Sequence, residues 1–240
     1  MTPLLSLSIV GLAALIHASF QLSISAFTLM SGHSLGRQQS RLRLTGLING
    51  FIIGVAVMTT LLLSTLCYLM LHFLTVALLP IIWTVLCALL LVIGVAVWVF
   101  YYRHERGTTL WLPRKTAEFL AERCKRTKNS GEAFGLGLAS AFGELLFTIA
   151  PLSVGALAII SSPIELQPIT FLLYVVVSLL SLLIVAFLVA SGTRISAIQY
   201  WRESNKRFLQ FAAGSALVVL ACFLYVNEVL ALPLLQGVGL

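Results

Sequence analysis

The sequence predicts an all-α polytopic membrane protein, with six transmembrane helices arranged as two inverted three-helix repeats and both termini outside. Three observations predict this class. The 240 residues are 60% hydrophobic and only 10% charged, whereas soluble domains carry about 25% charged residues. Six apolar segments are long enough to cross a bilayer. All Lys and Arg residues fall in three of the connections between these segments.

Each apolar segment supplies the roughly 20 residues that a membrane span requires. The segments are 7–31, 46–73, 77–101, 134–160, 169–191 and 208–231. We expect the first to be a retained transmembrane helix, because no charge precedes Arg37 and a secretory signal begins with a basic region. A short turn ending at Pro80 joins segments two and three, and a Pro-rich turn over 161–168 joins segments four and five.

The basic residues predict the orientation. The 15 Lys and Arg residues lie within 37–43, 103–128 and 194–207, after segments one, three and five. Basic connections stay in the cytoplasm, so both termini are expected outside. This distribution also explains the net charge of +7 without a nucleic-acid partner. The expected partners are the lipid bilayer and a small-molecule or ion substrate, and a homo-oligomer is compatible with the sequence.

The long basic connection divides the chain into two halves of similar size. Residues 1–102 form the first three-helix repeat and residues 133–240 the second. Within the connection, 103–132, Pro113 suits a helix start, and Phe119, Leu120 and Arg123 could share one face. We expect a short interfacial helix on anionic lipid there, and a regulatory or partner-binding role is the alternative.

Two stretches, 17–32 and 140–155, resemble each other when they are aligned without gaps. The aligned pairs are Gln21 with Glu144, Leu22 with Leu145, Ser25 with Thr148, Leu29 with Leu152 and Gly32 with Gly155. An odd number of spans per half reverses the second half in the membrane, so these stretches should run antiparallel. This is the pattern of an inverted repeat, whose substrate site typically lies near the midplane.

Glu144 is the leading candidate for a functional residue. It lies about 16 Å into its segment at 1.5 Å per residue, near the middle of a core about 30 Å thick. An ionisable residue at that depth is a functional-site hypothesis by default, and the alternative is a structural glutamate bonded to a neighbouring helix. The expected substrate or ion site consists of Glu144, His17, Gln21, Ser25, Ser140 and Thr148. Ordinary interhelical hydrogen bonding would give the same polar pattern.

Pro151 is expected to break or kink the fourth segment beside Glu144, because proline removes a backbone donor. Transporters place broken helices at their binding sites.

The four cysteines are Cys67, Cys87, Cys124 and Cys222, and they show no Cys-x-x-Cys spacing. Three of them, Cys67, Cys87 and Cys222, should lie at one depth, so a redox pair remains an alternative to ordinary buried thiols. No cofactor and no dedicated metal site are expected, because a metal would require more acids and histidines together.

Four short motifs resemble the LysE superfamily of membrane proteins. They are Ser-Gly-His-Ser-Leu-Gly-Arg at 31–37, the Gly-rich stretch 46–54, Phe-Gly-Leu-Gly-Leu at 134–138 and Thr-Ile-Ala-Pro-Leu-Ser-Val-Gly at 148–155. The first two are similar to the end of helix one and the start of helix two in LysE-type exporters, and the others to helix four of CcdA-type proteins. The resemblance implies two inverted three-helix repeats and a small solute or reducing equivalents as substrate. The proline-flanked cysteines of CcdA-type proteins are missing here.

The leading hypothesis is therefore a secondary transporter in a bacterial inner membrane, an exporter of a small polar or cationic solute coupled through Glu144. Two alternatives stay open. One is a CcdA/DsbD-like thiol-disulfide electron carrier, in which case the chain would be an oxidoreductase. The other is a membrane scaffold without transport activity.

Overall fold

A computed structural model describes residues 3–20, 22–35, 41–75, 78–100, 122–124 and 126–230. These residues are helical apart from short connections, and no strand occurs among them. The elements, in chain order, are α1 (Pro3–Ser19), α2 (Leu22–Leu35), α3 (Arg41–Phe73), α4 (Leu79–Phe100), α6 (Ser130–Gly143), α7 (Leu145–Ile160), α8 (Gln167–Ser178), α9 (Leu180–Ala190), α10 (Ile195–Ser204), α11 (Lys206–Leu224) and the π-helix η2 (Tyr225–Leu230).

Three helices in the described part of the chain are long and apolar enough to cross a membrane. They are Thr45–Phe73, Leu79–Val99 and Lys206–Leu230. Three bent pairs of shorter helices, α1 with α2, α6 with α7 and α8 with α9, would bring the number of spans to six. These helices and pairs cover the six segments expected from the sequence.

The long helices leave much of their apolar surface outside the protein core. In the most apolar 18-residue stretch of α3, only 28% is buried, and in that of α4 only 39%. Large apolar side chains such as Ile53, Leu71 and Val92 are more than half exposed. An apolar surface of this extent is unfavourable in water and is satisfied by lipid. The fold is therefore that of a membrane-embedded protein.

The bent spans carry polar or flexible residues at their bends. The bends measure 45° between α1 and α2, 79° between α6 and α7, and 47° between α8 and α9. Ser19 and Ser178 end α1 and α8, and each hydroxyl donates to the carbonyl three residues earlier, at 2.6 and 2.9 Å. Such back-bonding bends helices. Gly143, a poor helix former, precedes the bend between α6 and α7.

The bend in the fourth span differs from the sequence expectation. We expected the break at Pro151, but α7 continues through this residue. The chain turns instead at Glu144, which ends α6 and begins α7 with φ −78° and ψ −13°. The weak helix former Gly143 and the interhelical bonds of Glu144 described below provide the physical reason, while the proline is accommodated inside an otherwise buried helix.

Glycines set the closest helix contacts. A Cβ added at Gly50 or Gly54 of α3 would collide with the backbone carbonyls of Ser130 or Phe134 of α6. A Cβ at Gly137 of α6 would collide with the carbonyl of Phe51 in return. Small residues allow helix backbones to approach in this way, so α3 and α6 are packed backbone to backbone.

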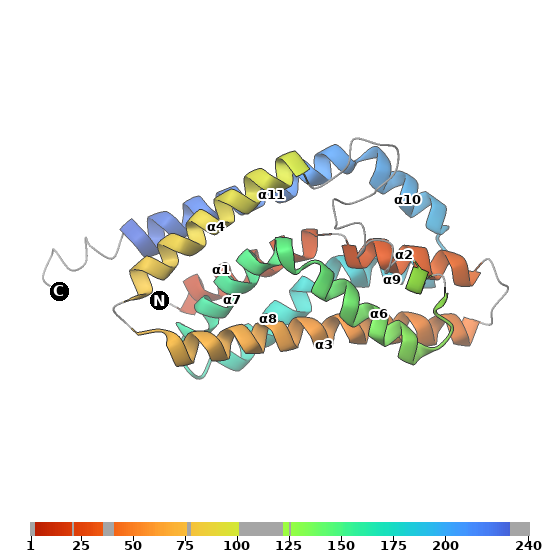
Figure 1. The fold of residues 1–240 in the computed structure, drawn as a ribbon, viewed down its shortest axis with the longest axis horizontal. Helices are drawn as coiled ribbons and strands as arrows, with labels where there is room; N and C mark the ends of the chain where they lie inside the picture. The colour runs from red at the N-terminus through yellow and green to blue at the C-terminus, as the bar shows by residue number, and fades with distance from the viewer. Residues whose placement is uncertain are drawn as a thin grey trace, which may run out of the picture.

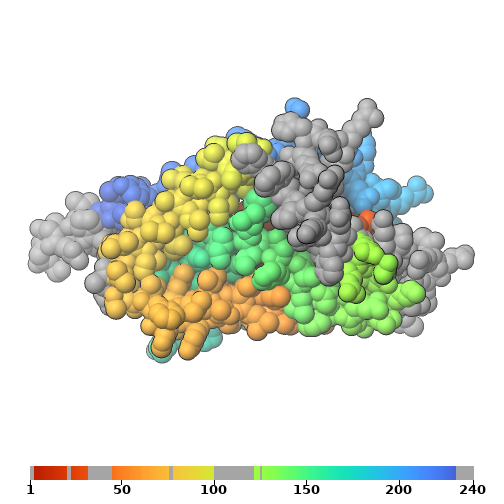
Figure 2. Space-filling view, in the orientation of Figure 1, coloured from red at the N-terminus to blue at the C-terminus, as the bar shows by residue number. Residues whose placement is uncertain are grey.

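α4 and α11 form a second close pair and run side by side along one edge of the molecule (Figure 1). Gly214 of α11 lies against the ring of Trp98. The Trp98 Nε1–H donates to the Phe211 carbonyl at 3.1 Å. In the space-filling view, α7 lies between α4 and α3 on one face (Figure 2).

The two ends of the molecule differ in the elements that they gather. The start of α1, the end of α3, the start of α4, the end of α11 and the α7–α8 connection lie at one end (Figure 1). The end of α2, the start of α3, the start of α6 and α10 lie at the other end (Figure 1). Described Lys and Arg residues lie at the start of α3, just before α6 and on α10, so the second end is named the basic end below. The interfacial helix expected within 103–132 lies mostly outside the described residues.

Candidate functional site

Glu144 lies at the sharpest of the three bends, between α6 and α7. Its side chain is 6% exposed, and it reaches the start of α2. The Ser23 backbone N–H donates to Glu144 Oε1 at 2.7 Å, and the Ser23 hydroxyl donates to Oε2 at 3.1 Å. The acid of one bent span is thus bound to the bend of another.

The position of Ser23 explains why an acid is favourable here. The first N–H groups of a helix have no intrahelical acceptor, and a membrane offers no water to satisfy them. The N-terminus of a helix also carries partial positive charge. The Glu144 carboxyl satisfies one of these donors of α2 and lies at the positive end of its dipole.

His17 lies on the last turn of α1 and connects this span to α8. Its Nδ1 is 3.1 Å from the Tyr174 hydroxyl. The Tyr174 ring in turn occupies the space that a side chain at Gly155 of α7 would need. Gly155 therefore makes room for the tyrosine, and the His17–Tyr174 bond links α1, α8 and the second half of the fourth span.

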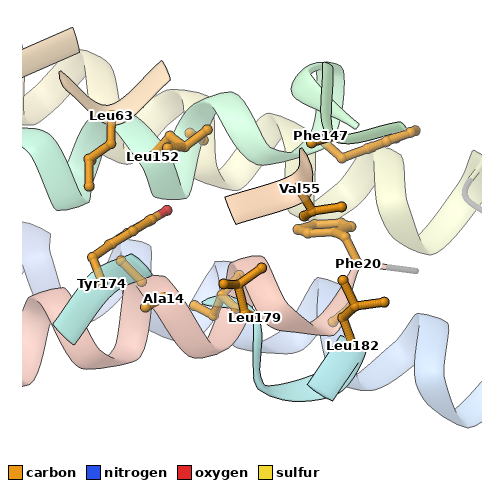
Figure 3. Packing of buried hydrophobic residues seen from close by; sticks show 14 of the residues in the cluster. Ala14, Phe20, Val55, Leu63, Phe147, Leu152, Tyr174, Leu179 and Leu182 are labelled. Carbon is orange, nitrogen blue, oxygen red and sulfur yellow. The ribbon is translucent and has the colours of Figure 1, made fainter. Parts of the chain in front are cut away.

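A small cavity of about 20 Å³ lies where the three bends meet. One residue from each bend, Phe20, Glu144 and Leu179, lines it. Figure 3 shows Phe20, Val55, Leu179 and Leu182, which form its apolar wall. The complete lining is His17, Ala18, Phe20, Ser23, Ile24, Val55, Thr59, Glu144, Ser178, Leu179, Ser181 and Leu182. This volume suits one water molecule or one small ion.

The structure brings together some of the expected site residues and separates others. Glu144 and His17 share the cavity. Ser140 and Thr148 are buried, but they do not line it, and their hydroxyls donate to the carbonyls of Gly137 and Glu144 in their own helices, at 3.0 and 3.2 Å.

Ser25 and Gln21 complete the expected set. The Ser25 hydroxyl accepts a hydrogen bond of 2.8 Å from Arg202 Nη2 of α10, away from the cavity. Gln21 lies outside the described residues.

Several polar residues of the site were not singled out in the sequence. Around the cavity these are Ser23, Thr59, Ser178 and Ser181, and Tyr174 binds His17. Single hydroxyls are common in membrane helices, so these residues carry no signal of their own. Serine pairs that interrupt an apolar run, such as Ser178 and Ser181, were the available indication of a bend.

The described cysteines are not joined by disulfides. All four are free, and none lines the cavity. Burial raises the pKa of the Cys124 thiol to about 12, so it is not a reactive thiolate. Among the described residues, no three His, Cys, Asp or Glu side chains gather as a metal-binding group.

Comparison of the chain with family models, curated proteins and solved structures gives no match. The function is therefore argued from the site.

Proposed function

We propose that the chain is a secondary transporter, an exporter of a small polar or cationic solute, in which Glu144 binds the coupling proton or cation. The observation that carries this proposal is the meeting of three bent spans at one cavity lined by Glu144. Broken helices and an acid at their junction are the usual construction of a transporter site.

The bonds of Glu144 are compatible with loading and release of a proton. In the ionised form both oxygens accept from Ser23. In the protonated form, the bond to the backbone N–H can persist at Oε1, while the new O–H donates to the Ser23 hydroxyl, because a hydroxyl both donates and accepts. The carboxyl can therefore change its charge without leaving α2.

The inverted repeat is a further part of this proposal, and the positions of two bends support it. α2 begins at Leu22 and α7 at Leu145, and these two residues are opposite each other in the alignment of 17–32 with 140–155. α1 packs against α8, and in the same way α6 packs against α3. In each contact, a helix that begins the first span of one repeat packs against the second span of the other repeat. Membership of the LysE superfamily, a bacterial inner membrane and outside termini belong to the same proposal.

The size of the cavity is compatible with one state of the proposed transport cycle. A volume of about 20 Å³ holds one water or ion but no organic solute. We infer a closed state in which the coupling site is formed and the solute path is shut. Changes at the three bends would open it alternately to the two sides.

Proteoliposomes that contain a pH-sensitive dye test the proposal. A panel of small amines, amino acids and polar solutes is applied as outward gradients, and proton movement is followed for each. We expect at least one solute to drive proton movement through the wild type, and Glu144→Gln to slow this movement by at least about tenfold, as expected for a pathway acid.

Glu165→Gln is the matched control, because it makes the same chemical change at an exposed residue of the α7–α8 connection. It should transport like the wild type. Wild-type flux no greater than that of empty liposomes would contradict the transporter proposal. Unchanged coupling in the Glu144→Gln variant would exclude Glu144 from it.

A further inference from the structure

The fifth span carries its polar residues on one face. Between Gln167 and Ala190, the side chains with a hydroxyl or an amide group are Gln167, Thr170, Tyr174, Ser178 and Ser181. Successive members of this set are three or four residues apart, the spacing that keeps side chains on one side of a helix. We name this set the polar stripe.

The polar stripe faces the protein and not the lipid. Thr170 and Tyr174 are the buried residues of α8, and both are 0% exposed. Apolar side chains on the other faces, Ile169, Leu172 and Val176, are between 50% and 62% exposed. Polar residues that face neighbouring spans either form hydrogen bonds between helices or line a pathway.

Hydrogen bonding between helices does not account for Thr170 and Ser178. The Thr170 hydroxyl donates to the carbonyls of Leu166 and Gln167, each at 3.0 Å. The Ser178 hydroxyl donates to the Val175 carbonyl at 2.9 Å. These bonds lie within the fifth span and join no second span, so they favour the pathway.

The polar stripe connects the Glu144 cavity with one end of the molecule. Ser178 and Ser181 line the cavity, and Gln167 begins α8 at the end opposite the basic end (Figure 1). The distance from Gln167 to Ser178 along the helix is about 16 Å at 1.5 Å per residue, or about half of a hydrocarbon core 30 Å thick. The stripe therefore crosses the half of the membrane between the cavity and that end.

Tyr174 blocks the stripe beside the cavity. Its hydroxyl lies 3.1 Å from Nδ1 of His17, which lines the cavity. The two rings pack edge to face with their centroids 5.8 Å apart, and the tyrosine ring fills the space beside Gly155 of α7. Figure 3 shows this ring directed from α8 toward α7. One side chain thus joins α1, α7 and α8 between Thr170 and the cavity.

We propose that the polar stripe lines the outer half of the path between the Glu144 cavity and the outside, and that Tyr174 is the gate that closes it. The proposal rests on the proposed function, since it takes this cavity as the coupling site. A rotation of Tyr174 away from His17 would open the cavity toward Thr170 and Gln167 without moving Glu144. His17 is therefore a positioning residue that holds the gate shut.

Thiol accessibility tests the path without knowledge of the solute. In a chain with its four cysteines replaced, a charged methanethiosulfonate is applied from the side on which Glu165→Cys of the α7–α8 connection reacts. The reagent requires water and a thiolate. We expect Thr170→Cys to react at least about tenfold faster than Leu172→Cys, which faces lipid, because hydrocarbon excludes both. Equal rates would overturn the path.

Tyr174→Phe tests the gate, because it keeps the ring and removes the hydroxyl that is bonded to His17. We expect it to raise the reaction rates of Ser178→Cys and Ser181→Cys at the cavity by about three- to fivefold, the change in equilibrium for the loss of one hydrogen bond between membrane helices.

Tyr68→Phe is the control for the gate, since it makes the same change at a tyrosine of α3 that is 64% exposed. It should leave the rates at the cavity unchanged. Unchanged rates with Tyr174→Phe would overturn the gate. An equal rise at Leu172→Cys would also overturn it, because a general loosening of the protein affects both faces of the span.

The outcome for the path is separable from the outcome for export. Where the wild type transports a solute in proteoliposomes, modification of Thr170→Cys should lower the flux by at least about tenfold, because the attached group occupies the path. Full flux after modification would overturn the path and leave the export proposal standing. Reaction of the stripe as expected, in a protein that transports none of the solutes, would support the path and contradict export alone.

Discussion

The bond between Glu144 and Ser23 gives one carboxyl two roles. It satisfies a backbone donor at the start of α2, and it lines the cavity where the bent spans meet. In hydrocarbon, an unsatisfied backbone N–H costs several kcal/mol, so the structural role alone favours an acceptor at this position. A substitution of Ser23 can separate the two bonds of the carboxyl, because only the bond to Oε2 depends on the Ser23 side chain.

Ser23→Ala removes the hydroxyl bond to Glu144 Oε2 and leaves the backbone bond to Oε1 in place. We expect it to lower the free energy of unfolding by about 1–2 kcal/mol, the range for a buried hydrogen bond to a carboxylate within a membrane protein. Unfolding in mixed micelles of increasing SDS content measures this quantity.

Ser8→Ala is the control for that variant. Ser8 also carries a hydroxyl in the first span, but the hydroxyl is exposed and donates to the Leu4 carbonyl of its own helix at 2.9 Å. Its loss should change stability by less than about 0.5 kcal/mol. Equal effects of the two substitutions would contradict a specific Ser23–Glu144 bond.

The sequence identified the acid of this site but not its partner. A lone glutamate in an apolar span is visible as an exception, whereas the donor that it binds is a backbone N–H, which every residue has. Ser140 and Thr148 share a helix face with Glu144, but their hydroxyls bond to carbonyls of their own helices. Spacing alone does not distinguish such a hydroxyl from one that lines a path.

At the scale of elements, the closest packing in the molecule is between α3 and α6. It depends on Gly50, Gly54 and Gly137, each of which faces backbone atoms of the other helix. Other glycines of the same helices, such as Gly46 and Gly135, have no atom within 4 Å of an added Cβ. The glycine pattern in the sequence indicated close packing but not which glycines provide it.

Gly54→Ala should destabilise the protein by about 1–3 kcal/mol, the usual cost of forcing an extra methyl into a packed contact. Gly46→Ala on the same helix should have no cost and should stabilise it by up to about 1 kcal/mol, because alanine is the better helix former. The same SDS titration compares them. A loss of equal size in both variants would disprove the close approach of α3 and α6 at Gly54.

The bends show the limit of prediction from local sequence. Pro151 lies in the middle of the fourth predicted segment, and proline is the strongest helix breaker, yet α7 continues through it and the bend lies at Glu144. Tertiary bonds from Ser23 and the weak helix former Gly143 determine the position. The break in the fifth span, between Ser178 and Leu180, was not predicted, because leucine-rich sequence on both sides supports a helix.

At the scale of the whole molecule, the start of α3, the start of α6 and α10, which carry or adjoin described basic residues, lie together at one end (Figure 1). The six apolar segments and the distribution of basic residues could be recognised from the sequence, because the bilayer limits the length and the flanking charge of each span separately. The meeting of three bends at one cavity could not be predicted from the sequence, since it depends on contacts between segments that are far apart in the chain.

A cysteine-accessibility experiment tests the orientation. In a chain with its four cysteines replaced, Glu165→Cys should react with a membrane-impermeant maleimide in intact cells, because the α7–α8 connection is expected outside. Glu203→Cys, exposed on α10, should react only after the membrane is permeabilised. The opposite result would reverse the proposed topology, and labelling of both sites in intact cells would contradict a single orientation.

The described helices include three long uninterrupted ones and three bent pairs. α3, α4 and the α11–η2 helix are uninterrupted. The bends of the three pairs each contribute a residue to the lining of the cavity of about 20 Å³. A rotation at one bend would displace side chains that lie beside the other two bends. We therefore expect the three bent pairs to move together, relative to the three uninterrupted helices.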